Sequence, residues 1–177
     1  MKKLFALLLV LTAVLICVGC SSDSFAHHEV LDTFMAVRYE GQFDKMNQLA
    51  PQEYWDWYKN QGRSIDDLLS YAEGAYYSQL NMMVRQFGED PKVTYNITED
   101  ETMDGDRLDR IANALTKYGI ETSSVKNGRV ITVDLTITGS QASDTTEEVY
   151  ELVTIGEGEY VLYITEDENT FSVSFRM

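Results

Sequence analysis

The spacing of hydrophobic residues changes once along the chain, and this change separates a helical half from a strand-rich half. Apolar side chains recur every three or four positions over residues 29–41 and 43–50, which is typical of helices that bury one face. Residues 52–60 continue this pattern with an aromatic-rich segment. Ser64 is the expected N-cap of a long amphipathic helix that ends at Gly88.

Beyond Pro91 the hydrophobic residues alternate with polar ones, which is the period of a strand with one buried face. A short helix with one apolar side interrupts this pattern at 106–118. Ile131, Val133 and Leu135 share one expected face of their strand, and Asp134 lies on the other. The predicted strands are 93–97, 130–138, 145–155, 159–165 and 170–176.

The order of these elements indicates an α+β fold, with helices packed on one face of a curved antiparallel sheet. Short turns such as Gly156-Glu157-Gly158 join the last strands and favour a meander. No internal repeat, low-complexity tract or linker divides residues 29–177. We therefore expect one domain over this range.

One segment carries a resemblance to a known superfamily. Residues 34–46, Phe-Met-Ala-Val-Arg-Tyr-Glu-Gly-Gln-Phe-Asp-Lys-Met, resemble the first helix, glycine-containing break and second helix of the nuclear-transport-factor-2-like, cystatin-like cone. The last strands resemble the sheet of that superfamily, and the chain is similar to small lipoproteins of Gram-positive bacteria built on this fold. The helix at 106–118 departs from the simplest pattern. The resemblance implies a cone-like domain, a fold that serves many functions and specifies none.

The N-terminus has the pattern of a secretory signal. Two lysines precede an apolar run over residues 4–18, which is shorter than the ~20 apolar residues of a transmembrane helix. Residues 17–20, Cys-Val-Gly-Cys, resemble the lipobox of bacterial lipoproteins, although its first position is usually Leu. This resemblance implies cleavage before Cys20 and a diacylglyceryl anchor on it. An ordinary signal peptide and a membrane anchor are the alternatives.

These features predict a signal peptide at 1–19, a polar tether at 20–28 and a lipid-anchored domain on the extracytoplasmic face of the cell membrane. Two acyl chains on Cys20 would anchor the protein stably, whereas one chain binds a membrane only marginally. Because Cys17 leaves with the signal peptide and Cys20 carries lipid, we expect no disulfide in the mature domain.

The net charge of −15 narrows the range of partners. Loss of Lys2 and Lys3 with the signal peptide makes the mature charge −17. An acidic chain does not displace counterions from phosphates, so nucleic acid is excluded as a partner. Electrostatic adsorption to anionic lipid is excluded for the same reason, which leaves the acyl anchor on Cys20 as the expected contact with membrane lipid.

The candidate catalytic groups are few. His27 and His28 are the only histidines, and both fall in the expected tether. We interpret them as solvated linker, with adventitious metal binding as the alternative. The folded body would then lack both imidazole and free thiol, which excludes Ser-His-Asp and Cys-His catalysis and the usual zinc sites. No phosphate loop or dinucleotide motif is present, so we expect no cofactor and no metal.

Acidic residues offer two weaker hypotheses. If Asp100 opened a calcium-binding EF-hand loop, Ile111 would occupy the twelfth position, which needs a bidentate Glu. We therefore interpret residues 99–106 as a solvated loop whose Asp residues cap the next helix, with a looser surface calcium site as the alternative. Asp134 is the only carboxylate in the middle of a clean strand, and it is a candidate acid–base group that its register turns away from the apolar face.

Aromatic side chains are the better candidates for binding. Tyr and Trp suit a pocket that is apolar with a few polar groups, and Trp55, Tyr58 and Tyr76 are the expected pocket residues. The alternative is that these rings fill the core. A cluster of this kind favours a non-enzymatic module that binds a small molecule, a peptide or an envelope protein.

Two other functions remain open. The first is a structural subunit that forms a homodimer through the outer sheet face, which carries Val130, Thr132, Thr136 and Thr138. The second, the least favoured, is an enzyme that uses carboxylate and tyrosine side chains as acid and base.

Overall fold

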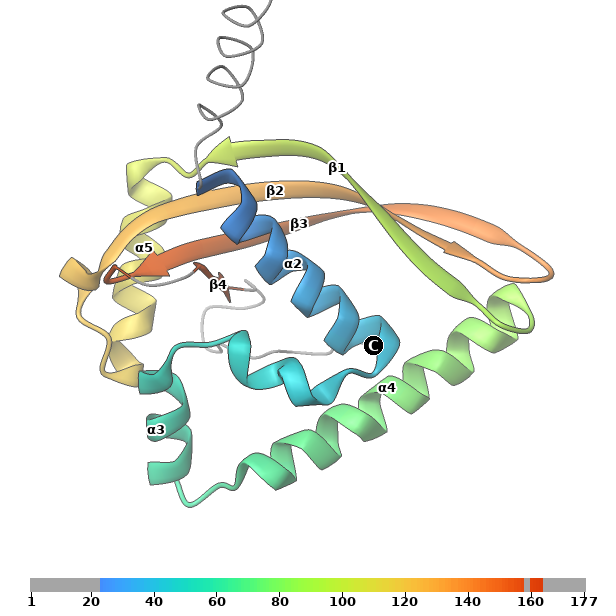
Figure 1. The fold of residues 1–177 in the computed structure, drawn as a ribbon, viewed down its shortest axis with the longest axis horizontal. Coiled ribbons are helices and arrows are strands. Elements are labelled where there is room, and N and C mark those ends of the chain that lie inside the picture. Colours follow the sequence, from blue (N-terminus) through green and yellow to red (C-terminus); the bar gives the residue numbers. More distant parts are fainter. Residues whose placement is uncertain (1–22, 158–159, 164–177) are drawn as a thin grey trace, which may run out of the picture.

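An antiparallel, curled sheet forms the centre of the molecule (Figure 1). Its strands follow the chain in the order β1-β2-β3-β4 within the part that the structure, a computed structural model, describes, namely residues 23–157 and 160–163. The strands are β1 (Lys92–Thr102), β2 (Val125–Thr138), β3 (Ser143–Ile155) and β4 (Tyr160–Tyr163). The α+β class expected from the sequence is confirmed.

The helices lie where the hydrophobic spacing predicts them. Ser64 caps the long helix α4 by accepting a 3.0 Å hydrogen bond from the Asp67 backbone N–H, and Gly88 follows its last residue with a φ of 93°. The helical elements are α2 (Asp23–Glu40), η2 (Phe43–Gln48), α3 (Gln52–Asn60), α4 (Ile65–Phe87), α5 (Gly105–Leu115), η3 (Thr116–Tyr118) and η4 (Thr122–Ser124).

Two elements extend beyond their predicted bounds. Helix α2 begins at Asp23, inside the segment expected to be a polar tether. Strand β1 continues to Thr102, although residues 99–102 were expected in a solvated loop. After a bulge between Ile97 and Glu99, β1 pairs again with β2, and Asp100 lies opposite Ile131. Pairing with β2 gives hydrogen-bond partners to the backbone N–H and C=O groups of this stretch, so its polar side chains did not prevent a strand.

The concave face of the sheet carries the main core. Ile131, Val133 and Leu135 on β2 are all at most 3% exposed, as the alternation predicted. Helix α2 runs along this face (Figure 1), and its Phe34 ring meets Tyr150 of β3 edge-on at 5.4 Å between centroids.

Helices cover both faces of the sheet at one end, which corrects the prediction that they cover a single face. Residues 150–154 of β3 are all buried, although alternate side chains point to opposite faces. Tyr150 faces α2, whereas its neighbour Glu151 pairs with Arg107 of α5. Helix α5 therefore packs on the face opposite α2, and the sequence did not reveal which face the inserted helix would choose.

At the other end, the tip of the β2–β3 hairpin caps helix α4. The backbone N–H groups of Gln141 and Ala142 donate to the Phe87 carbonyl at 2.8 and 3.3 Å, and the Ser140 hydroxyl accepts from the Glu89 N–H at 2.9 Å. These bonds satisfy groups at the helix end that have no partner within the helix.

Of the described helices, none combines the length and the apolar character needed to cross a bilayer. The predicted signal peptide, the predicted lipid attachment at Cys20 and the last predicted strand at 170–176 lie outside the described residues.

Candidate functional site

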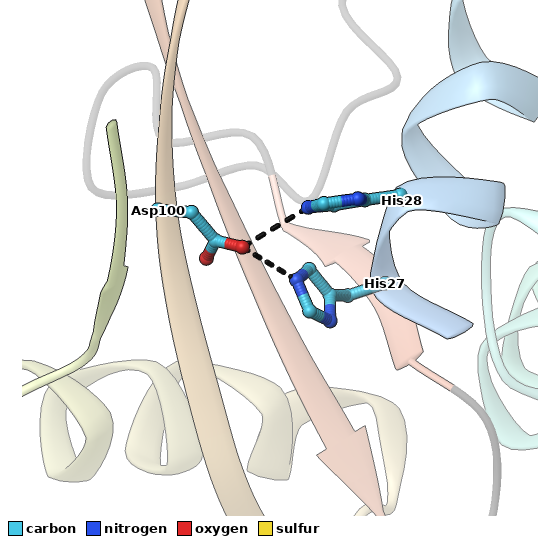
Figure 2. A group of neighbouring side chains, drawn as sticks. All are labelled: His27, His28 and Asp100. Carbon is cyan, nitrogen blue, oxygen red and sulfur yellow. Dashed lines mark hydrogen bonds and ion pairs between the residues drawn. The ribbon is translucent and has the colours of Figure 1, made fainter. Parts of the chain in front are cut away.

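Two adjacent histidines of α2 converge on one carboxylate of β1 (Figure 2). The Nε2 atoms of His27 and His28 lie 2.7 and 3.0 Å from the same oxygen, Oδ2 of Asp100. The two rings meet edge-on, with their centroids 4.3 Å apart. Two donors thus share one acceptor between the start of a helix and the end of a strand.

The sheet register brings Asp100 to the histidines. Asp100 lies opposite Ile131, whose buried side chain belongs to the concave face, so the carboxylate points to the face that α2 covers. The side chain of His27 is 3% exposed, whereas those of His28 and Asp100 are 39% and 22% exposed. The cluster is therefore closed on one side and open to solvent on the other.

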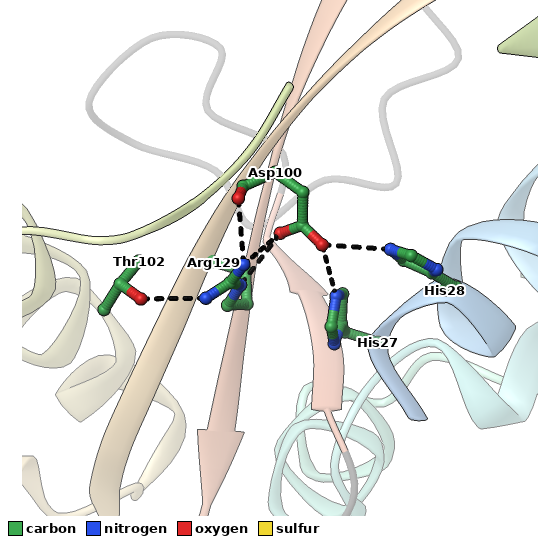
Figure 3. A network of polar contacts seen from close by, with 5 residues as sticks. All are labelled: His27, His28, Asp100, Thr102 and Arg129. Carbon is green, nitrogen blue, oxygen red and sulfur yellow. Dashed lines mark hydrogen bonds and ion pairs between the residues drawn. The ribbon is translucent and has the colours of Figure 1, made fainter. Parts of the chain in front are cut away.

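Arg129 of β2 holds the other oxygen of the carboxylate (Figure 3). Its Nε and NH2 groups donate to Asp100 Oδ1 at 2.8 and 2.6 Å, and NH2 also donates to the Asp100 carbonyl at 2.9 Å. Its NH1 group donates to Thr102 Oγ1 at 2.8 Å. These bonds orient the carboxylate so that Oδ2 faces the two imidazoles.

The electrostatics favour an ionised Asp100. Burial by itself raises the pKa of this carboxyl group, but hydrogen bonds from His27, Arg129 and His28 outweigh burial and lower the pKa to about 2. Asp100 is therefore an anion at neutral pH, with two imidazole donors on one oxygen and a guanidinium on the other.

The interpretation of His27 and His28 as solvated linker is wrong. Both side chains belong to α2, and His27 is almost fully buried against the sheet. The expectation that the folded domain contains no imidazole is therefore also wrong. Sequence reasoning missed Arg129 altogether. It considered Asp100 only as part of a calcium loop, since nothing local links either residue to a histidine pair more than 70 positions away. The one visible signal was that the only two histidines are adjacent.

A second feature is an open groove of about 480 Å³ between α2 and the outer strand β1. Its walls combine carboxylate, amine, amide and hydroxyl groups with apolar patches, and Tyr95 donates its hydroxyl to the Asp32 carboxylate. The lining residues are Asp32, Thr33, Met35, Ala36, Tyr39, Glu40, Gln42, Lys45, Val93, Thr94 and Tyr95.

Tyr39 at the edge of this groove remains a neutral donor. Burial raises the pKa of its phenol to about 12, against the opposing effect of the Arg38 charge. Arg38 pairs with Glu148 of β3 at 3.3 Å, and Glu148 also accepts from the Tyr150 hydroxyl. A phenol with a raised pKa stays protonated at neutral pH, so Tyr39 suits hydrogen bonding to a ligand better than proton abstraction.

The expected pocket residues Trp55, Tyr58 and Tyr76 are not among those that line the groove. The Trp55 indole N–H donates to two backbone carbonyls, those of Asn47 and Ala50, at 3.1 and 3.0 Å. Trp55 and Tyr58 are 4% and 7% exposed and belong to the core. Tyr76 on α4 is half-buried against the Phe43 ring. The structure brings Trp55 and Tyr58 together on α3 and leaves Tyr76 on another helix.

The other two acidic candidates, Asp134 and Asp104, occupy ordinary structural positions. Asp134 is half-buried on β2, between Asn96 of β1 and Glu147 of β3. Asp104 accepts a 2.8 Å hydrogen bond from the Arg107 N–H and caps α5, as the sequence predicted.

Comparisons with protein-family models, with curated proteins and with solved structures find no match to this chain.

Proposed function

We propose that this chain is an extracytoplasmic lipoprotein, anchored through acylated Cys20, whose α+β domain binds a small ligand without catalysing a reaction. The groove between α2 and β1 carries the proposal. Its volume of about 480 Å³ lies within the range of about 300–1,000 Å³ typical of small-molecule sites. The curled sheet and the helices along its concave face support assignment to a nuclear-transport-factor-2-like cone.

The charges around the groove favour a zwitterionic ligand, such as an amino acid or a short peptide. Asp32 and Glu40 are exposed carboxylates that would attract an amino group, and Lys45 would attract a carboxylate. Thr94 and the neutral Tyr39 offer hydroxyl groups for the peptide backbone. The chain's net charge of −15 strengthens the attraction for the amino end.

The test is calorimetry of the purified chain with di- and tripeptides, each also in N-acetylated and C-amidated form. Both blocked forms should bind more weakly, because each loses one charge. Asp32→Asn should weaken binding of the free peptide and Lys45→Met should abolish the preference for a free carboxylate. The matched controls are Asp109→Asn on α5 and Lys126→Met on β2, two exposed residues outside the groove lining. Equal affinity for all forms, or equal effects of the controls, would contradict the proposal.

Lipid anchoring has a separate test. In cells fed a labelled fatty acid, the wild-type chain should carry the label and fractionate with membranes. Cys20→Ala should lose the label and Cys17→Ala should keep it. A labelled Cys20→Ala variant would overturn the assignment of the anchor.

Two competing functions have weaker support. A homodimer through the outer sheet face would bring together copies of a surface on which Asp134 and Glu147 are direct cross-strand neighbours. Pairing that surface with itself concentrates like charges. An acid–base enzyme would need a carboxylate beside a tyrosine of lowered pKa, whereas burial raises the pKa values of Tyr39 and Tyr54 to about 12.

A further inference from the structure

We propose that His27, His28 and Asp100 bind one divalent transition-metal ion, of which zinc is the representative, and that the ion links the start of α2 to β1. This site is distinct from the peptide groove, and the inference does not depend on the proposed function.

The geometry of the three donor atoms supports the site. One ring nitrogen of each histidine and a carboxylate oxygen of Asp100 all lie within 4.8 Å of one another (Figure 2). Zinc bonds of about 2.0–2.1 Å in a tetrahedral arrangement place neighbouring donor atoms roughly 3.3 Å apart. The two nitrogen–oxygen distances of 2.7 and 3.0 Å fall short of this by a few tenths of an ångström. A small outward shift of the side chains would let the ion take the place of the two hydrogen bonds, with each neutral imidazole binding through Nε2 and carrying its proton on Nδ1.

The types of donor select the metal. Two imidazoles and one carboxylate suit zinc and its neighbours in the first transition row, and they match three-ligand zinc sites in which water fills the fourth position. Calcium needs six to eight oxygen ligands, and magnesium prefers oxygen ligands in octahedral geometry. The cluster offers Asp100 as its single carboxylate, so both of these ions are poor fits.

The surroundings of the site hold its carboxylate in place. Arg129 occupies Oδ1 of Asp100 and is itself tied to Thr102, which leaves Oδ2 directed at the imidazoles (Figure 3). Hydrogen bonds of this kind to a metal-binding carboxylate are a regular part of metal sites. The guanidinium repels a cation, but it lies on the far oxygen. The half-exposed side of His28 gives an ion a path from solvent.

The position of the site suggests what the ion does. Residues 27 and 28 lie near the start of α2, and Asp100 lies 73 positions after His27. An ion held between them would cross-link the start of α2 to the sheet. Such a link stabilises the folded state, because the unfolded chain does not bring these ligands together.

The test uses the full chain, purified in detergent through a histidine-free tag and stripped of metal with a chelator. Zinc titrated by calorimetry should bind at one equivalent, and cobalt should give the visible absorption of a tetrahedral site that zinc then abolishes. Because the chain has only two histidines, a nitrogen-containing site is unambiguous. Zinc should also raise the melting temperature, whereas calcium and magnesium at the same concentration should not.

The variants His28→Ala and Asp100→Asn should each weaken zinc binding at least tenfold. The matched control is Glu101→Gln, which removes the same charge from the neighbouring, exposed residue on the other face of β1. It should bind zinc like the wild type. Circular dichroism without metal shows whether each variant is folded. Absence of binding by the folded wild-type chain, or unchanged affinity in folded His28→Ala and Asp100→Asn, would overturn the proposal.

Discussion

His27 Nε2 lies 2.7 Å from Asp100 Oδ2, although 73 positions separate the two residues in the chain. This contact joins the first turns of α2 to the last residues of β1, the outer strand of the sheet. Since Arg129 of β2 holds the same carboxylate, three elements meet at Asp100. The residue is thus a structural junction as well as a proposed metal ligand.

Replacing Asp100 should therefore destabilise the metal-free domain. We expect Asp100→Ala to lower the free energy of unfolding by about 1–3 kcal/mol, because Arg129 and the buried His27 both lose a charged hydrogen-bond partner. Urea unfolding followed by circular dichroism measures the change. Glu101→Ala, on an exposed neighbour, should stay within about 0.5 kcal/mol of the wild type. Equal losses in the two variants would contradict the role of Asp100.

A second test concerns the ion pair that fastens α5 to the sheet. Glu151 is 3% exposed and accepts from Arg107 Nε, so Arg107→Ala leaves a buried carboxylate without its cation. The expected loss of unfolding free energy is about 3 kcal/mol. Arg110→Ala removes the same side chain from an exposed position of α5 and should change stability little. A comparable loss in the control would show that removing any arginine side chain from α5, rather than breaking this ion pair, is responsible.

The close approach of the β2–β3 hairpin to α4 requires a glycine. A Cβ atom on Gly139 would lie 2.4 Å from the Phe87 carbonyl oxygen, which the backbone N–H groups of Gln141 and Ala142 already hold. We expect Gly139→Ala to lower the melting temperature, with a cost of about 1–3 kcal/mol. Gly74→Ala on α4 meets no atom within 4 Å and should stabilise the protein by about 0.5–1 kcal/mol. Calorimetric melting distinguishes these opposite signs.

Alkaline pH should weaken the aromatic cluster around Tyr54. Burial raises the pKa of this phenol from 10.0 to about 12, so the folded state holds the proton more tightly than the unfolded state. The contribution of the protonated Tyr54 phenol to the free energy of unfolding is complete below pH 10 and is lost as the pH rises towards 12. Between about pH 9 and pH 11.5, the wild type should lose about 1–2 kcal/mol more than Tyr54→Phe. Tyr71→Phe, on a ring that is 67% exposed, should behave like the wild type.

Much of the fold was predictable from local patterns. Residues 52–60 and 65–87 became helices within one residue of their predicted bounds, because each is rich in apolar side chains at helical spacing and is bounded by a local signal, Pro51 before the first and Gly88 after the second. The buried face of β2 also followed from alternation. The placement of α5 on the opposite face of the sheet could not be predicted in this way. An amphipathic pattern shows that a helix buries one face, but it does not show which surface that face packs against.

The candidate sites were much less predictable. Trp55 and Tyr58 were candidates for a pocket, with the core as the alternative, and they lie in the core. The sequence left both open, since it shows that aromatic side chains are present and not which space they occupy. The groove at α2 and β1 is lined by unremarkable residues such as Thr33, Thr94 and Gln42, and they meet only because two distant elements pack together.

The sequence by itself determined the class of the fold, the spacing of apolar residues in its helices and strands, and the acidic charge. These properties depend on neighbouring residues and on composition. Tertiary structure alone decided that His27 is buried and that His27, His28 and Arg129 gather around Asp100. The reason is the register between β1 and β2 after the β1 bulge, which turns Asp100 towards α2. A register is set by the pairing of two strands, so the sequence of one strand does not reveal it.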